Sequence, residues 1–281
     1  MRDLSGSTAI VTGASQGIGV AIARALADRG VTVVLAARSE EALAKLSHEI
    51  AESGGRALAV PSDITDPSAQ EQLVARTLRE FGHIDLLINN AGVVIPSAYE
   101  QLAPEQIERV IALNLGAPML LTRRVLPSML ARARGHIVNI ASLGGLMGVG
   151  WAETYGATKH ALVGFTRSLR ISLAERGAKV SVSVICPGFV EEVGMYADEV
   201  VSRGNRAPWA LGTSSVHSVA AAVLRAIEHD LPEVVVSPRP IRLLLALAAL
   251  SPRLGEWMIR RAGTHRVFEL TAAAQERERE G

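Results

Sequence analysis

The chain has 281 residues, of which 29 are basic and 28 acidic, so its formal net charge is +1. Such an even balance argues against a general nucleic-acid-binding protein, which normally carries a basic excess. Apolar residues make up 48% and charged residues 20% of the chain, a composition that supports a buried core and excludes global disorder.

The compartment is indicated by what the sequence lacks. Cys186 is the single cysteine, so neither an internal disulfide nor a cysteine-based metal cluster can form. The first residues contain no apolar leader, and the longest apolar stretch, 243–250, is far below the ~18 residues of a membrane span. The seven histidines show no metal-ligand spacing. We therefore expect a cytoplasmic protein without a metal.

Short, continuously apolar runs alternate with helical stretches along the first two-thirds of the chain. The pattern predicts strands at 8–12, 31–36, 57–60, 84–89, 136–140, 180–185 and 234–236. Between them it predicts helices at 18–29, 40–53, 68–81, 104–133 and 153–176. Repeated strand–helix–strand units join through right-handed crossovers. The expected fold is α/β: a single doubly wound Rossmann-type domain, with a parallel sheet of about seven strands in the order 3-2-1-4-5-6-7 and helices on both faces.

After residue 190 the alternation of strand-like and helical segments becomes irregular. We expect a catalytic domain over 1–237, in which 191–214 form a substrate lid that is mobile without cofactor, and an amphipathic C-terminal extension over 238–281 with a frayed end. Within 238–266 the chain carries six arginines and a single acid, Glu256.

A glycine-rich segment joins the first predicted strand to the first predicted helix. Glycines there let the turn tighten, let the backbone approach a pyrophosphate and let the helix pack closely on the sheet. The helix N-terminus offers N–H groups and a partial positive charge to phosphates. An ordinary glycine-rich turn is the plainer alternative, but the flanking strand and helix supply the context of a dinucleotide site. We expect the cofactor to contact Gly13, Ser15, Gln16, Gly17, Ile18 and Gly19.

The spacing of these glycines resembles the short-chain dehydrogenase/reductase family, over about residues 5 to 190. Further segments follow that family's order: Asn-Asn-Ala-Gly at 89–92, then Asn114, Ser142, Tyr155-x-x-x-Lys159 and Pro187-Gly188. The resemblance implies an NAD(P)-dependent oxidoreductase that forms a homodimer or homotetramer through the long helices after strands four and five. It also implies cofactor contacts from Asp63, Ile64, Asn90, Ala91, Gly92, Tyr155, Lys159, Pro187, Gly188 and Val190.

The choice of cofactor depends on the end of the second predicted strand. An acidic residue there would bond the ribose hydroxyls of NAD and repel the 2′-phosphate of NADP. This chain has Arg38 instead, whose guanidinium can pair with a phosphate, and Ser15 can add a hydroxyl. A solvated arginine at a helix start is the alternative. We predict NADP(H), with NAD(H) as the weaker candidate.

Four residues are candidates for the chemistry. Tyr155 and Lys159 lie four apart in a predicted helix and therefore share a face. A neighbouring ammonium and the positive nicotinamide of an oxidised cofactor stabilise a phenolate, so we expect a lowered pKa and proton exchange between Tyr155 and a substrate oxygen. Ser142 is placed to hydrogen-bond the same oxygen, and by resemblance Asn114 would help to organise a proton relay. Taken singly, these residues have plain alternatives: Tyr155 and Lys159 could be an exposed pair, Ser142 could cap a turn, and Asn114 could satisfy backbone groups inside its helix.

The chain departs from the family after Pro187-Gly188, where a threonine that contacts the nicotinamide is usual. Glu192 stands at that position, preceded by Glu191, and neither has an assigned role. The sequence indicates little about the identity of the substrate. Candidate pocket residues are mostly apolar or aromatic, which favours a lipophilic ketone, aldehyde or secondary alcohol: Leu143, Gly144, Met147, Val149, Trp151, Phe189, Met195 and Tyr196.

Three functions remain open. The first is an NADP(H)-dependent oxidoreductase acting on a lipophilic carbonyl or secondary alcohol, steroid- or retinoid-like. The second is a 3-oxoacyl-carrier-protein reductase, against which the long extension counts, because those enzymes usually end soon after the seventh strand. The third is a non-catalytic dinucleotide-binding scaffold. Arginines, leucines and Trp257 in 239–261 suit a peripheral membrane contact or a substrate entrance, and equally a helix that covers the core or a subunit contact.

Overall fold

The computed structural model describes residues 3–191, 207 and 211–280. Seven parallel strands form one sheet, as predicted. In spatial order they are β3 (Arg56–Pro61), β2 (Thr32–Ala37), β1 (Thr8–Thr12), β4 (Leu86–Asn89), β5 (Gly135–Ile140), β6 (Val180–Pro187) and β9 (Glu233–Val236). The predicted order is confirmed, with β9 as the seventh strand. Continuous burial of β1, β4 and β5 explains why their sequences do not alternate.

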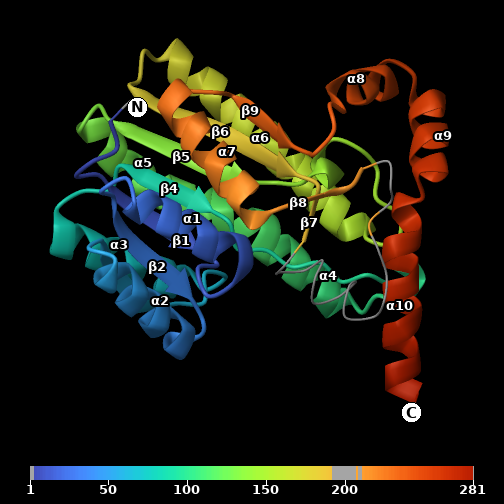
Figure 1. The fold of residues 1–281 in the computed structure, drawn as a ribbon, viewed down its shortest axis with the longest axis horizontal. Helices are drawn as coiled ribbons and strands as arrows, with labels where there is room; N and C mark the ends of the chain where they lie inside the picture. Colours follow the sequence, from blue (N-terminus) through green and yellow to red (C-terminus); the bar gives the residue numbers. More distant parts are fainter. Residues whose placement is uncertain (1–2, 192–206, 208–210, 281) are drawn as a thin grey trace.

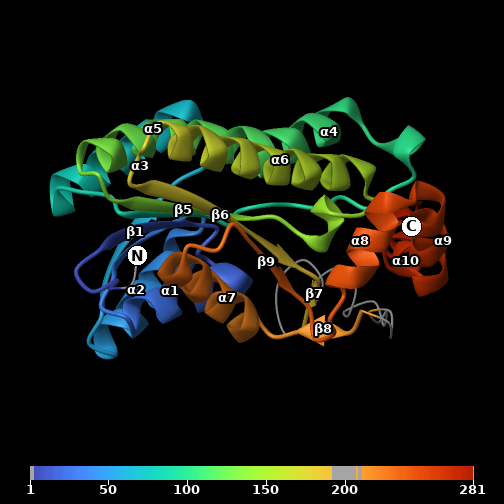
Figure 2. The ribbon, with the colours of Figure 1, turned by 90° about the horizontal axis from the view of Figure 1, so that it is seen from above.

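Helices cover both faces of the sheet (Figures 1 and 2). One face carries α1 (Gly17–Ala27), α2 (Glu40–Glu52) and α7 (Val216–His229). The other carries α3 (Pro67–Phe81), α5 (Ala117–Ala131) and α6 (Glu153–Glu175), with α4 (Pro104–Ile111) alongside. Each face therefore has its own apolar layer, and together they make a single doubly wound Rossmann-type domain.

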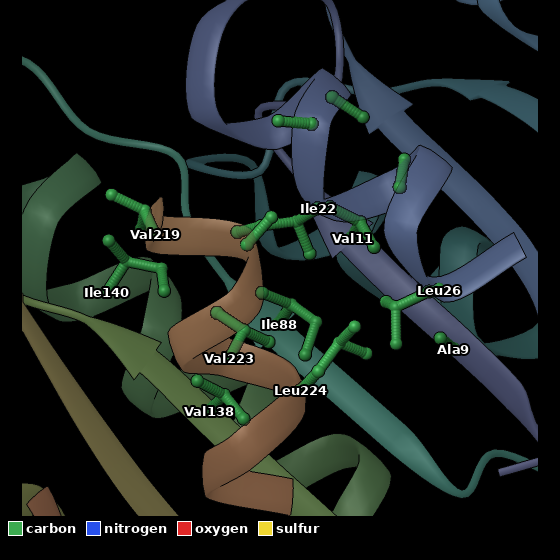
Figure 3. Packing of buried hydrophobic residues seen from close by; sticks show 14 of the residues in the cluster. Ala9, Val11, Ile22, Leu26, Ile88, Val138, Ile140, Val219, Val223 and Leu224 are labelled. Carbon is green, nitrogen blue, oxygen red and sulfur yellow. The ribbon is translucent and has the colours of Figure 1, made fainter. Parts of the chain in front are cut away.

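The first of these layers lies between the sheet and α1 and α7. Figure 3 shows Ile22 and Leu26 of α1 and Val223 of α7 against Val11 and Ile88 of the central strands. All five side chains are almost fully buried. This packing holds α1 against β1, and so fixes the glycine-rich turn between them at the carboxyl edge of the sheet.

Two local features were not predicted. The helix expected at 104–133 is interrupted by a π-helical turn, η2 (Ala112–Gly116), between α4 and α5. A second, two-stranded parallel sheet pairs β7 (Phe189–Val190) with β8 (Thr213–Ser214), at the two ends of the segment expected to be a lid. Strands of two residues leave no periodicity to recognise.

The end of the chain forms three helices beyond the sheet: α8 (Arg242–Leu250), α9 (Pro252–Ala262) and α10 (Thr264–Glu280). α10 continues to Glu280, and the expectation of a frayed end at 275–281 stays a prediction. Figures 1 and 2 place all three helices at one end of the molecule, near β7 and β8.

Candidate active site

A cavity of about 940 Å³ opens where the carboxyl ends of the parallel strands meet. Such an edge is where doubly wound folds bind ligands. Sixteen of the predicted cofactor residues and the predicted serine meet in this one cavity: Gly13, Ser15, Gln16, Gly17, Ile18, Arg38, Asp63, Ile64, Asn90, Ala91, Gly92, Ser142, Tyr155, Lys159, Pro187, Gly188 and Val190 line it. Gly19 and Asn114 do not line it.

The glycine-rich turn after β1 has the geometry that a dinucleotide phosphate requires. Gly13 has a φ of +66°, and a Cβ there would lie 2.9 Å from the Cα of Ala91. A Cβ on Gly19 would overlap the carbonyl oxygen of Gly13. The side chain of the N-cap residue Gln16 does not cap α1, and the first turn of this helix holds no acid. Its N–H groups and the positive end of its dipole are thus left for an anion, so the residues present fit the phosphates of a dinucleotide.

Arg38 and Asp63 lie in the same cavity, at the ends of β2 and β3. Arg38 is exposed, and Ser39 beside it caps α2 by accepting a hydrogen bond from the N–H of Ala42 at 3.3 Å. Asp63 accepts hydrogen bonds from the hydroxyl of Thr65 at 2.7 Å and from its N–H at 2.9 Å, and these bonds lower the pKa of the carboxyl group. An anionic Asp63 and a cationic Arg38 thus stand at one end of the cavity.

Tyr155 and Ser142 form the predicted pair. Ser142 follows β5, and its Oγ accepts a hydrogen bond of 3.0 Å from the N–H of Gly144, which fixes the side chain. The phenol of Tyr155, in the first turn of α6, lies close enough to the Ser142 hydroxyl for the serine to favour its ionised form. Two neighbouring hydroxyls at a cavity wall can bind one carbonyl oxygen between them.

The electrostatics of this pair differ from the expectation. Burial raises the pKa of Tyr155, and the nearby Ser142 hydroxyl only partly opposes that shift. Burial also lowers the pKa of Lys159 to about 8. The ammonium of Lys159 lies 5.6 Å from the centre of the Tyr155 ring and donates a hydrogen bond of 2.9 Å to the carbonyl of Ile140. The lowered pKa expected for Tyr155 is not found in the protein without cofactor, because burial disfavours the phenolate. The contribution expected from an oxidised nicotinamide stays a prediction.

Asn114 holds the loop after β4 in place. It lies in the π-helical turn η2, where its Oδ1 accepts a bond of 2.8 Å from the N–H of Val93 and its Nδ2 donates one of 2.8 Å to the carbonyl of the same residue. Nδ2 also reaches the hydroxyl of Thr158 on α6 at 3.3 Å. The side chain thus connects the Asn-Asn-Ala-Gly loop with the helix of Tyr155. Its part in a proton relay stays a prediction.

The substrate side of the cavity is assembled from distant segments. Five of the predicted pocket residues line it, namely Leu143, Gly144, Met147, Val149 and Phe189. Trp151 does not, and Met195 and Tyr196 lie outside the described residues. Thr264 and Phe268 of α10 line the cavity as well, and sequence reasoning missed both. No local signal marks them, because only the path of the chain end brings α10 to the cavity.

The segment expected to form a lid lies mostly outside the described residues, and Glu192 with it. Glu191 is described: its carboxylate accepts a hydrogen bond of 2.7 Å from the hydroxyl of Thr213, and its N–H donates to the carbonyl of Ser214. Glu191 therefore joins the two ends of the segment beside the small β7–β8 sheet. The motion expected of the lid stays a prediction.

Other reactive groups contribute little. Cys186 is fully buried, and burial raises the pKa of its thiol to about 12, so it is no nucleophile at neutral pH. Within the described ranges no three His, Cys, Asp or Glu side chains come close enough together to hold a metal ion.

Comparison with known proteins identifies the family. Residues 7–201 match the model of the short chain dehydrogenase family, and the chain belongs to that family. The ketoacyl reductase HetN of Nostoc sp. (strain PCC 7120 / SAG 25.82 / UTEX 2576) is 42% identical over 257 residues, which are 90% of this chain and 88% of that protein. A match of that extent reaches into the C-terminal extension.

Two solved structures resemble the fold closely. An actinorhodin polyketide ketoreductase variant with NADPH is 34% identical, has a TM-score of 0.74, and is matched over 84% of this chain and 97% of that one. A short chain dehydrogenase/reductase from Burkholderia phymatum in complex with NAD is 28% identical, with a TM-score of 0.81 over 90% of this chain and 96% of that one.

Proposed function

We propose that this oxidoreductase uses NADPH to reduce the ketone of a 3-oxoacyl group, with Tyr155 as the proton donor. The observation that carries the proposal is the pair of neighbouring hydroxyls of Tyr155 and Ser142 in the cavity that Arg38 and the glycine-rich turn also line. The ketoacyl reductase relative supports the substrate class. Because that match covers 90% of this chain and so reaches into the C-terminal extension, the extension no longer counts against a 3-oxoacyl substrate. The NADPH-bound neighbour supports the cofactor.

The roles of the side chains follow from their positions. The cofactor supplies the hydride when bound. Tyr155 is protonated at neutral pH because burial raises its pKa, and it donates that proton to the carbonyl oxygen of the substrate. Ser142 holds the same oxygen with its hydroxyl. Lys159 places a positive charge near the phenolate that forms, and so stabilises it.

Turnover of matched substrates tests this proposal. With NADPH, we expect reduction of the 3-oxobutanoyl thioester of N-acetylcysteamine with a higher kcat/KM than that of 2-alkanones of similar length. Reduction of a steroid or retinoid ketone in preference to the thioester would instead support the lipophilic-ketone alternative. Cofactor binding without turnover of any carbonyl compound would support the scaffold.

The self-association implied by the family is also a proposal. Apolar side chains are exposed on the helices that flank η2: Ile111 of α4 and Met119 and Leu120 of α5 are 40–44% exposed. Ile171 of α6 is 63% exposed. Exposed apolar groups on adjacent long helices favour a subunit interface there. The chain would then be a homodimer or homotetramer packed through α5 and α6.

A peripheral membrane contact is proposed for the extension. None of the helices among the described residues is long and apolar enough to cross a bilayer. Leu243 and Leu250 of α8 are 70% and 83% exposed, and Trp257 of α9 is 60% exposed. Arg253 and Arg261 lie exposed on α9, and the extension as a whole is rich in arginine. Exposed leucines and tryptophan beside cationic groups suit the surface of an anionic bilayer.

Replacing two of these leucines tests the contact. The full-length protein should co-sediment with phosphatidylserine-containing vesicles more than with neutral phosphatidylcholine vesicles. Leu243→Asp/Leu250→Asp should abolish this, because it removes apolar surface and adds negative charge. Equal sedimentation of both proteins contradicts the proposal. Loss of self-association in the variant, with no vesicle binding by either protein, would assign this face to a subunit contact.

A further inference from the structure

The first turn of α10 forms part of the cavity wall next to the catalytic tyrosine. Thr264 and Phe268 both line the cavity. Phe268 packs against the apolar cluster of Val94, Val110, Ala152 and Tyr155, and its ring lies 6.4 Å from that of Phe189. A Cβ on Gly150 would lie 3.4 Å from the Cβ of His265. The helix is thus seated on the walls of the site itself, and it follows α9 through Gly263, whose φ of +72° turns the chain.

Thr264 carries a buried hydroxyl that is left without a partner. The residue is only 6% exposed, and its Oγ1 makes no hydrogen bond with any part of the chain that the structure describes. Hydroxyls that are buried without a partner are rare, because burial removes their bonds to water. Where such a hydroxyl belongs to a residue that lines a cavity, the simplest explanation is a ligand that accepts its hydrogen bond. The oxygen is itself buried in the wall, so it reaches a ligand in the cavity by rotation about χ1, which exchanges the hydroxyl with the methyl group.

The position of Thr264 in its helix favours an oxygen as the bonding partner. Thr264 is the first residue of α10, a helix of 17 residues, and no acid lies in its first turn. The N–H groups of a first turn and the positive end of the helix dipole attract an acceptor oxygen. A hydroxyl donor in the same turn adds to that attraction. The unpartnered hydroxyl of Thr264 and its place in the first turn of α10 together indicate a subsite for a polarised oxygen. Phe268 and Phe189 form an aromatic wall beside this subsite.

We propose that Thr264 binds a second carbonyl oxygen of the substrate, separate from the one that Tyr155 protonates. In a 3-oxoacyl thioester that second oxygen is the thioester carbonyl. The inference rests on the proposed function for the name of the substrate, but the subsite requires only a dicarbonyl ligand. The C-terminal extension thus selects dicarbonyl compounds over simple ketones, and the phenyl rings contact the adjoining apolar atoms.

Binding of product analogues tests the subsite without requiring turnover. Titrate the full-length protein saturated with NADP⁺ with two ligands in a calorimeter: the 3-hydroxybutanoyl thioester of N-acetylcysteamine, and a secondary alcohol of equal length that lacks the second carbonyl. Thr264→Val should weaken binding of the thioester about tenfold, the size of one hydrogen bond, and should change the affinity for the alcohol by less than twofold. Thr264→Ser should restore thioester binding.

A second threonine on the same helix supplies the control. Thr271 is fully buried, its hydroxyl donates a bond of 2.9 Å to the carbonyl of Val267, and it does not line the cavity. Thr271→Val should therefore leave the ratio of the two affinities unchanged. Equal weakening of both ligands by Thr264→Val, or of neither, overturns the inference.

The same measurements separate the inference from the proposed function. If the wild-type protein binds the thioester through Thr264 but does not reduce the corresponding 3-oxo compound, the subsite stands and the proposed reaction fails. If it reduces the 3-oxo compound while Thr264→Val leaves binding and kcat/KM unchanged, the reaction stands and the subsite fails.

Discussion

Tyr155→Phe should lower kcat for carbonyl reduction by about 10²- to 10⁴-fold, the range that a positioned general acid contributes. The change removes one oxygen from a buried ring and leaves its apolar packing against Val94 and Phe268 in place. Substrate binding should weaken much less, because Ser142 and the cavity walls remain. Steady-state oxidation of NADPH and calorimetric binding of the substrate measure the two effects separately.

An exposed tyrosine provides the matched control for that substitution. Tyr99 is 55% exposed and lies outside the cavity, so Tyr99→Phe should leave kcat unchanged. A Tyr155→Phe variant with more than a tenth of the wild-type kcat would rule out the phenol as the proton donor.

The dependence of the reduction rate on pH is a second test of Tyr155 as the proton donor. The raised pKa of Tyr155 keeps the proton donor intact through the neutral range. Lys159, with a pKa of about 8, loses its charge as the pH rises through that value, and the phenolate then loses the stabilising charge of that ammonium. The rate of reduction should therefore fall above about pH 8. A profile that stays flat to pH 10 would contradict this role of Lys159.

Arg38→Asp should reverse the preference for NADPH over NADH. A charge-assisted hydrogen bond to a phosphate is worth about 1.5–3 kcal/mol, and an aspartate adds repulsion, so the ratio of kcat/KM for the two cofactors should fall by about 100-fold or more. Arg38 is exposed at the end of β2, so the fold should tolerate the change. Measuring both cofactors at a fixed substrate concentration gives the ratio.

An arginine outside the cavity controls for charge alone. Arg225 is exposed on α7 and does not line the cavity, so Arg225→Asp should leave the cofactor ratio unchanged. An unchanged ratio in Arg38→Asp would mean that this strand end does not read the 2′-phosphate. The related structures contain NADPH in one case and NAD in another, so the fold by itself does not make this choice.

Local signals were sufficient to predict the elements that build the nucleotide side of the cavity. Thr8–Thr12 matched its predicted bounds, because a run buried on both faces has to be continuously apolar. The glycines at 13 and 17 were recognisable because their φ values of +66° and +59° suit few other residues. Parallel strands place their carboxyl ends at one edge, and so the sequence order alone implied that Ser142 and the glycine-rich turn would lie near each other.

Other features depend on contacts that no window of sequence contains. The sign of the pKa shift at Tyr155 follows from how deeply the ring is buried, which the four-residue spacing to Lys159 does not reveal. The bonds between Asn114 and Val93 follow from the π-helical turn. The placement of Thr264 follows from the path of α8 and α9.

The chain by itself therefore determined the α/β class, the strand order, the glycine-rich turn and the set of hydroxyl and amine groups available for catalysis, because backbone conformation and burial periodicity are local properties. Only the tertiary structure decided which of those groups share a cavity, how burial shifts their proton affinities and which helix completes the substrate wall. Desolvation and contact across more than a hundred residues depend on the position of every neighbour, and those positions exist only once the whole chain has folded.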